Sequence, residues 1–118
     1  FCSTPSVPLS RAVSRKRAFE MLTTGDFIDA HTAHEYGLVN HVVPADRLDG
    51  TVDALAKNIA SKPADALRAG KALFYRQLNM PLAEAYQAAG QVMADNMLFP
   101  DTQEGIDAFI EKRDPNWT

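Results

Sequence analysis

Three histidines lie close together in the sequence and are the side chains best suited to bind a metal ion. His31 and His34 are three positions apart, and His41 follows in the next segment. Imidazoles at helical positions i and i+3 share one face, so they can bind the same ion. However, Glu35 directly follows His34, which is not the His-Glu-x-x-His order of zinc proteases. We therefore interpret the three as ordinary surface or half-buried histidines, and we predict no metal site.

Cys2 and two carboxylates are the other candidates for catalysis. Cys2, the only cysteine, would be a nucleophile if a base lay beside it, but a lone cysteine is more often a small buried hydrophobe. Asp101 and Glu104 fit a capping box at a helix start, with Asp in place of Ser or Thr, rather than a catalytic pair. A single cysteine also excludes an internal disulfide bond and favours a reducing compartment.

The histidines belong to a segment, residues 20–44, whose local signals are unusually clear. Gly25 suits the left-handed residue just past a helix end. Asp29 can accept a backbone N–H in the first turn of a new helix, and Gly37 supplies the next stop. The expected order is therefore a helix, a short extended step, a short helix and a strand.

The expected strand is residues 38–43 (LVNHVV), which are rich in β-branched side chains and are followed by Pro44. Its only local partner would be Phe27 and Ile28. Because a two-stranded ribbon is marginal alone, we expect a very small β pairing whose apolar residues need a further surface.

Most of the remaining chain predicts helices separated by proline. Their expected ranges are 15–23, 46–61 (or from residue 45), 64–78, 81–97 and 101–113. Residues 1–13 instead read as a loop with at most one helical turn near residues 9–13. Four large side chains between Pro63 and Met97 cannot all be buried in one thin helical layer, which predicts self-association; they are Leu67, Phe74, Tyr86 and Met93.

Charge and hydropathy exclude two classes of partner. The net charge is −3 with a pI near 5.5, so we predict no nucleic-acid binding. We interpret the one basic cluster as a solvated helix face, with a phosphate-facing patch as the alternative; it consists of Arg11, Arg15, Lys16 and Arg17. No apolar run approaches the roughly 18 residues that span a bilayer, so we predict no membrane association.

Two blocks of sequence resemble the enoyl-CoA hydratase/isomerase (crotonase) family. The first comprises residues 21–25 (MLTTG), 28–33 (IDAHTA) and 37–44 (GLVNHVVP). The second is residues 104–113 (EGIDAFIEKR), followed by Pro115. They stand in the family's order and at about its separation. The resemblance runs over the whole chain but covers only the C-terminal half of the family.

The resemblance implies an acyl-CoA substrate and a particular chemistry. Family members hold the thioester oxygen with two backbone N–H groups that stabilise an enolate-like intermediate. Hydratases then use two glutamates to add water across the double bond. Both N–H donors and both glutamates belong to the family's N-terminal half, before the position that matches Phe1. The resemblance thus implies that this chain alone has no catalytic residues and is inactive, and that it needs no cofactor, because coenzyme A is part of the substrate.

Two positions can be carried over from the family as CoA-binding residues. Phe109 and Lys112 match an aromatic residue and a lysine that, in several members, reach the CoA of a neighbouring subunit near its adenine and phosphate. An aromatic ring offers stacking, and an ammonium one helical turn away offers charge. The alternative is that Phe109 is a core residue and Lys112 an ordinary surface residue. Phe1 and Cys2 would lie at the edge of the acyl pocket.

The loop before Arg11 departs from the hydratase pattern. Many hydratases have a Gly-Ala-Gly-Gly-Thr-like loop there, whereas residues 1–5 read FCSTP. This loop resembles a subgroup known only as enoyl-CoA-hydratase-domain-containing proteins. The resemblance therefore does not imply ordinary hydratase activity.

We thus expect an all-α fold with one very small β pairing, the incomplete C-terminal helical part of a crotonase-like domain. Residues 1–44 would form the edge of its core and residues 45–118 a helical oligomerisation region. Because the first residue is Phe1, we expect a piece of a longer acyl-CoA-processing protein, assembled as a trimer or dimer of trimers in the cytoplasm, or in the mitochondrial matrix of a eukaryote. The alternatives are a natural, non-catalytic assembly module and, more remotely, a small enzyme using Cys2 or the histidines.

Overall fold

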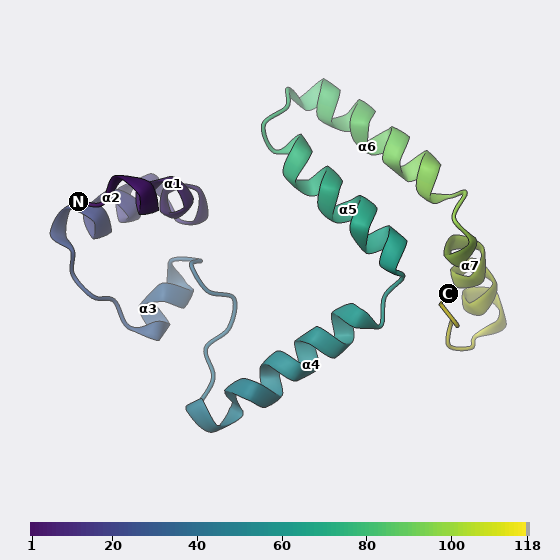
Figure 1. The fold of residues 1–118 in the computed structure, drawn as a ribbon, viewed down its shortest axis with the longest axis horizontal. Coiled ribbons are helices and arrows are strands. Elements are labelled where there is room, and N and C mark those ends of the chain that lie inside the picture. Colours follow the sequence, from purple (N-terminus) through teal and green to yellow (C-terminus); the bar gives the residue numbers. More distant parts are fainter. Residues whose placement is uncertain (118) are drawn as a thin grey trace. The chain divides into compact units, whose positions relative to one another are not determined.

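The computed structural model describes residues 1–117 and is all-helical over that range, with no strand (Figure 1). The α-helices are α1 (Ser3–Ala12), α2 (Arg15–Thr24), α3 (Ala30–Glu35), α4 (Leu48–Ala60), α5 (Ala64–Gln77), α6 (Leu82–Asn96) and α7 (Pro100–Glu111), and the 3-10 turn η1 (Ala45–Arg47) precedes α4. The all-α prediction is confirmed. The chain divides into two compact units, one of residues 1–51 and one from Val52 onward, and α4 begins in the first and continues in the second.

The structure corrects the prediction for the N-terminal residues, because α1 is a full helix rather than a loop. Pro5 lies in its first turn, where backbone N–H groups have no partner within the helix and a missing one costs nothing. Pro8 lies inside the helix and removes one N–H donor. Ser10 Oγ donates to the backbone oxygen of Val7 at 3.2 Å within the same helix. Pro5 and Pro8 therefore do not prevent a helix here, although their presence in the sequence favoured a loop.

The predicted strand at residues 38–43 is also wrong. These residues have no regular secondary structure, and no pairing with Phe27 or Ile28 is formed within the described chain. A strand is defined by hydrogen bonds to a neighbouring strand, so β-branched composition without a partner leaves the segment irregular. Phe27 is fully exposed.

The first unit is held together by small contacts around α2 and α3. The helices α1 and α2 pack together, and the buried apolar residues are small: Val13, Ala18 and Ala33. The guanidinium of Arg17 lies 4.1 Å from the ring centroid of Tyr36 and donates to the backbone oxygen of Glu35 at 3.0 Å. Asp29 caps α3 as expected, accepting the N–H of Thr32 at 2.7 Å, and this bond lowers the pKa of its carboxyl group.

We expect Gly37→Ala to lower the free energy of unfolding by about 1–2 kcal/mol. Gly37 ends α3 in the left-handed conformation (φ 80°), and an added Cβ would meet only the backbone oxygen of Ala12 at 4.0 Å. The cost is therefore conformational rather than steric. The matched control is Gly50→Ala in α4, where nothing lies within 4 Å. That change should raise stability by roughly 0.5–1 kcal/mol. Thermal unfolding followed by circular dichroism measures both, and two effects of the same sign would contradict this argument.

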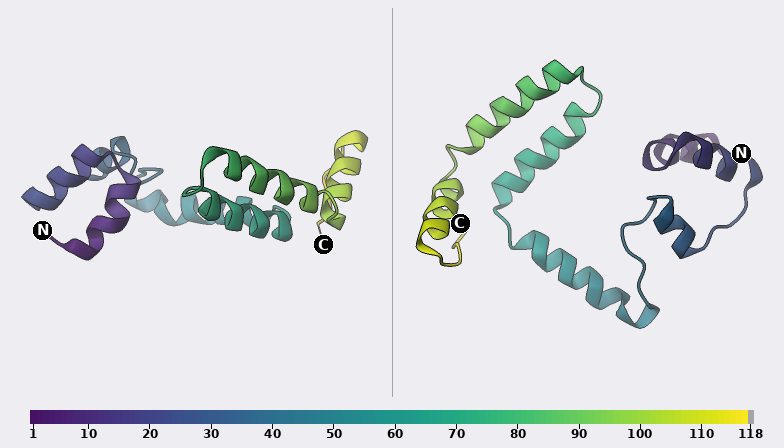
Figure 2. Two further views of the ribbon diagram at one scale, coloured as in Figure 1. Left: turned by 90° about the horizontal axis from the view of Figure 1, so that it is seen from above. Right: turned by 180° about the vertical axis from the view of Figure 1, so that it is seen from behind.

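In the second unit, α5 and α6 run side by side in opposite directions (Figure 2). Proline sets both starts, since Pro63 and Pro81 each stand just before the first helical residue. A short turn after α5, whose Met80 N–H bonds the backbone oxygen of Gln77 at 3.0 Å, reverses the chain.

The second unit leaves most of its large apolar side chains exposed. Among its described residues, the only buried apolar side chain is Ala108. The exposed fraction is 56% for Phe74, 73% for Tyr86 and 65% for Met93. Area removed from water stabilises a fold by about 25 cal/mol per Å², so these residues contribute little where they stand. The apolar faces of α5 and α6 are thus available to a further surface.

Candidate functional site

The two residues expected to bind CoA lie together at the end of α7. Phe109 is on the last turns of the helix, and its side chain is 86% exposed within residues 1–117. Lys112 directly follows the helix and is exposed. It adopts the left-handed conformation, with φ 55° and ψ 41°. Among residues 1–117 it is the only non-glycine residue with a positive φ, a conformation often associated with functional sites.

The left-handed turn at Lys112 folds the C-terminal segment back onto α7. Arg113 N–H bonds the backbone oxygen of Ala108 at 3.0 Å. The guanidinium of Arg113 then reaches Glu104 through two bonds of 2.6 and 3.0 Å, and the backbone N–H of Asn116 donates to the same carboxylate at 2.6 Å. We call Glu104, Arg113 and Asn116 the tail clamp.

The electrostatics of the tail clamp favour its ionised form. The hydrogen bond from Arg113, followed by that from the backbone of Asn116, lowers the pKa of Glu104 from its ordinary 4.5 to about 2. Arg113 also binds Glu111, and its two carboxylate partners raise the pKa of its guanidinium. Both nearby glutamates are therefore engaged by Arg113. No ion pair of Lys112 occurs within the described part of the chain.

Trp117 ties the same segment to another part of the second unit. Its indole N–H donates to the backbone oxygen of Ser61, just after α4, at 2.8 Å. Its ring packs against Gly105 so closely that a Cβ there would lie 3.3 Å from a ring carbon. An alanine at position 105 would require the ring to shift by a few tenths of an ångström. Glycine at this position thus allows the tail to lie close to α7.

A hollow of about 470 Å³ opens beside Phe109 and Trp117. Its lining comes from the start of α5, the end of α6, helix α7 and the tail at Trp117. Asn96 contributes a side-chain oxygen that is buried without a hydrogen-bond partner among the described residues. Its backbone oxygen accepts the hydroxyl of Thr102 at 2.6 Å. Most of the lining is apolar, but Asp101 and Thr102 also line the hollow beside Asn96.

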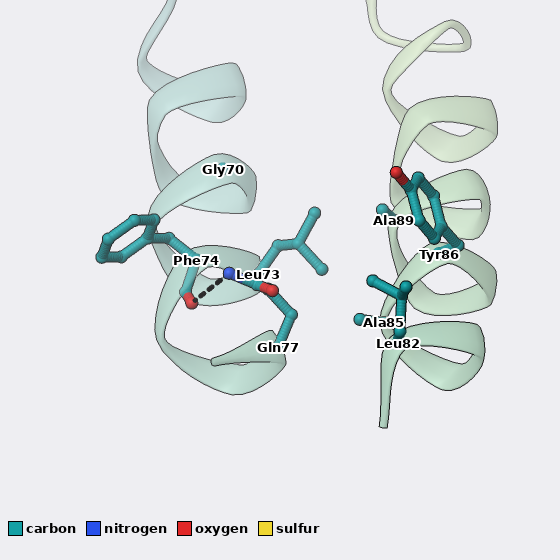
Figure 3. A pocket seen from close by; sticks show the side chains of 8 residues that line it. All are labelled: Gly70, Leu73, Phe74, Gln77, Leu82, Ala85, Tyr86 and Ala89. Atoms are coloured by element: carbon teal, nitrogen blue, oxygen red, sulfur yellow. Dashed lines mark hydrogen bonds between the residues drawn. The ribbon is translucent and has the colours of Figure 1, made fainter. Parts of the chain in front are cut away.

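A second hollow, of about 450 Å³, lies between α5 and α6 (Figure 3). Leu73 points across to α6, and Leu82 and Tyr86 line the opposite wall. The only hydrogen bond drawn there joins Gln77 Nε2 to the backbone oxygen of Phe74, at 3.3 Å. This groove is mainly apolar, and its polar side chains are Gln77 and Tyr86.

The expected chemical residues of the first unit are exposed. Phe1 and Cys2 precede and cap α1, and both are solvent-accessible with Cys2 as a free thiol. His31, His34 and His41 line one hollow of about 350 Å³. Within the described residues, no group of three His, Cys, Asp or Glu side chains is arranged to hold a metal ion.

The predicted capping box at Asp101 is wrong. Because it assigned Glu104 to a helix cap, the contact of Glu104 with Arg113 was not predicted. Helix α7 begins one residue earlier, at Pro100, and has no side-chain cap. Asp101 is therefore inside the first turn and buried, and Glu104 is free to face the tail. Glu104 and Arg113 are nine residues apart, which places them on opposite faces of a continuous helix. Only the turn at Lys112 brings them together, so helical spacing gave no signal.

We expect the tail clamp to loosen as the pH falls from about 4.5 to about 2. The pKa of Glu104 is lowered on folding, so its contribution to stability is complete above 4.5 and is lost as the pH falls through about 2. Fluorescence of Trp117, the only tryptophan, reports the change. The control is Glu104→Gln, which should show a smaller change over the same window. An identical acid transition in that variant would contradict the assignment.

Comparisons with a family model and with curated proteins point to the same family. The family model described as enoyl-CoA hydratase/isomerase matches residues 3–118. The rat protein "Enoyl-CoA hydratase domain-containing protein 3, mitochondrial" is 50% identical over all 118 residues, and the human protein of the same name is 48% identical. The chain spans 39% of the length of each of these relatives.

Solved structures agree with the fold. An enoyl-CoA hydratase from Mycobacterium smegmatis is 52% identical with a TM-score of 0.96, and human enoyl Coenzyme A hydratase domain-containing protein 3 is 48% identical with the same TM-score. Each match covers 99% of this chain and 46% of the solved chain. The chain is therefore similar in fold to part of each of those proteins.

Proposed function

Because the chain belongs to the enoyl-CoA hydratase/isomerase family, we propose that it serves an acyl-CoA-processing protein by supporting oligomerisation and forming one edge of the CoA site. The observation that carries this proposal is that an 86% exposed Phe109 and an exposed Lys112 stand three residues apart at the end of α7. Leaving a large ring in water is unfavourable unless a ligand or partner covers it.

The chemistry of this pair suits the nucleotide end of CoA. Adenine has a flat π-face that stacks on an aromatic ring, and the ribose phosphate beside it is an anion that an ammonium attracts. Arg113 occupies Glu104 and Glu111, which leaves Lys112 without a competing carboxylate partner among the described residues. The CoA would be bound by another subunit and covered by this edge. Phe1 and Cys2, exposed before α1, are proposed for the edge of the acyl pocket.

We expect Phe109→Ala and Lys112→Met each to weaken CoA binding on the order of tenfold in the protein that contains residues 1–118. The first change removes stacking and the second removes a charge. Isothermal titration calorimetry with CoA measures both. The matched control is Lys71→Met, which removes a positive charge from α5 at a residue that does not line the hollow beside Phe109. Affinities unchanged in both test variants would contradict the proposal.

An assembly module without a role in CoA binding is the second candidate. The exposed apolar faces of α5 and α6 favour it, because they can pack against other copies without any contribution from α7. Under this alternative, changes at Phe109 and Lys112 leave CoA affinity intact, whereas changes on α6 alter only the oligomeric state. The two candidates are therefore separated by the same set of variants.

The compartment we propose is the cytoplasm or the mitochondrial matrix. The rat and human relatives carry "mitochondrial" in their names, whereas other relatives are bacterial, such as the probable enoyl-CoA hydratase of Mycobacterium tuberculosis. Within residues 1–117, no helix is both long and apolar enough to cross a bilayer.

A further inference from the structure

We propose that Glu104, Arg113 and Trp117 are positioning residues that hold Lys112 at a fixed place beside Phe109, so that the site recognises the ribose phosphate of CoA. This inference rests on the proposed CoA-binding role of Lys112. It assigns a task to three residues that need not touch the ligand themselves. The evidence comes from backbone geometry, from the hydrogen bonds of the tail, and from the distribution of charge.

The backbone fixes where the Lys112 side chain starts. A lysine in the left-handed conformation is strained relative to glycine, and such a residue persists only where neighbouring contacts determine its conformation. On one side, its own N–H and that of Arg113 reach the carbonyl groups of the last turn of α7, at 3.4 Å to Phe109 and 3.0 Å to Ala108. On the other side, the tail clamp holds the residues that follow.

The tail clamp fixes the chain after Lys112 at two further points. The carboxylate of Glu104 receives the two-pronged guanidinium of Arg113 and the backbone N–H of Asn116. Paired bonds of this kind fix orientation as well as distance. Beyond them, Trp117 contacts Gly105 of α7 and bonds Ser61. The segment from Lys112 to Trp117 is thus tied to α7 at both ends.

The tail clamp also engages the charge of Arg113 and leaves that of Lys112 available to a ligand. Arg113 binds both Glu104 and Glu111, whereas Lys112 forms no ion pair in the described part of the chain. If Arg113 were absent, these two carboxylates would be free to attract the Lys112 ammonium or to repel an incoming phosphate. Arg113 therefore acts through Lys112, by removing its competitors.

The experiment compares CoA with 3′-dephospho-CoA, which lacks only the ribose phosphate. The ratio of their dissociation constants reports recognition of that phosphate, and it is measured by calorimetry in the protein that contains residues 1–118. Lys112→Met should bring the ratio close to one. Glu104→Gln and Arg113→Gln should each reduce it at least about threefold. The exchange of both residues, Glu104→Arg with Arg113→Glu, should recover part of the loss.

Two further variants separate positioning from stability. Arg113→Lys keeps the positive charge but loses the two-pronged hydrogen bonding, so the ratio of dissociation constants should also fall in this variant. Because its charge is unchanged, it still tests positioning if the other clamp variants fail to fold. Arg68→Gln breaks a comparable exposed ion pair with Asp65 on α5 and is the matched control. It should leave the ratio unchanged.

The outcomes distinguish this inference from the proposed function. If the clamp variants lower the melting temperature but leave the ratio unchanged, while Lys112→Met abolishes it, the clamp is only structural and this inference is wrong. If Lys112→Met itself leaves the ratio unchanged and Phe109→Ala leaves CoA affinity unchanged, the proposed CoA-binding role fails. A reduced ratio in Glu104→Gln, Arg113→Gln and Arg113→Lys, with no change in Arg68→Gln, supports positioning.

Discussion

A polypeptide limited to residues 1–118 is expected to leave crotonyl-CoA unhydrated. Family resemblance assigns both oxyanion N–H donors and both catalytic glutamates to positions before Phe1. Removing one oxyanion donor costs about 10²–10³-fold in rate, and losing general acid–base catalysis costs about 10²–10⁴-fold. The expected deficit is therefore on the order of 10⁴-fold or more, relative to a family member that spans both halves.

Two carboxyl groups of the described chain, those of Asp29 and Glu104, are held in structural hydrogen bonds. A general acid that works near neutral pH needs a raised pKa. The two carboxyl groups whose pKa is clearly displaced, those of Asp29 and Glu104, are both displaced downward by hydrogen bonds. One caps α3 and the other holds the tail, so each already has a structural task.

Spectrophotometric loss of the crotonyl-CoA double bond tests the prediction. A family member spanning both halves serves as the positive control, and mass spectrometry of the sample excludes a longer contaminant. Turnover by the verified 118-residue polypeptide would show that this chain supplies its own catalytic groups. The assignment of the chemistry to the other half would then be wrong.

Helix boundaries could be predicted from the sequence because their signals are local. Pro63 and Pro81 stand at the expected starts of α5 and α6, and Gly37 ends α3 in the expected left-handed conformation. Each signal depends on the φ preference of one residue or on one missing N–H, and neither needs a distant partner. The boundaries of these helices accordingly agree within a few residues.

Features that depend on distant partners could not be predicted. Residues 38–43 have a β-branched composition but no partner strand in the described chain, so they form none. Proline near the N-terminus was interpreted as loop punctuation, although Pro5 sits harmlessly in the first turn of α1. The strand needed a distant partner, whereas α1 was missed because Pro5 is tolerated in a first turn and its helical hydrogen bonds are local.

The candidate site divides in the same way. Phe109 and Lys112 could be found because family resemblance marks them by position. Glu104, Arg113 and Trp117 could not, because their contacts depend on a left-handed lysine that no propensity favours. The hydrogen bond from Trp117 to Ser61 joins residues that are far apart in the sequence. No local sequence pattern predicts such a contact.

Association is the second large effect that we expect, and α6 is where it should be most sensitive. Tyr86 and Met93 are seven residues apart, so they lie two turns apart on one face, and they are 73% and 65% exposed. Soluble monomers rarely leave an apolar patch larger than a few hundred Å² uncovered. Another copy of the protein is the cover that we propose, since homo-oligomers are the commonest solution.

The double change Tyr86→Lys and Met93→Lys should weaken association on the order of 100-fold, because it places two charges in a surface that must be desolvated. Sedimentation velocity on the protein that contains residues 1–118 measures the effect. The matched control is Gln91→Lys, which lies on the opposite side of α6 and leaves a side chain able to pair with Asp95, the present partner of Gln91 at 2.8 Å. Equal weakening by the control would mean that added charge alone disperses the protein. A monodisperse monomer of the unmodified protein at high concentration would show that these apolar faces need no second copy.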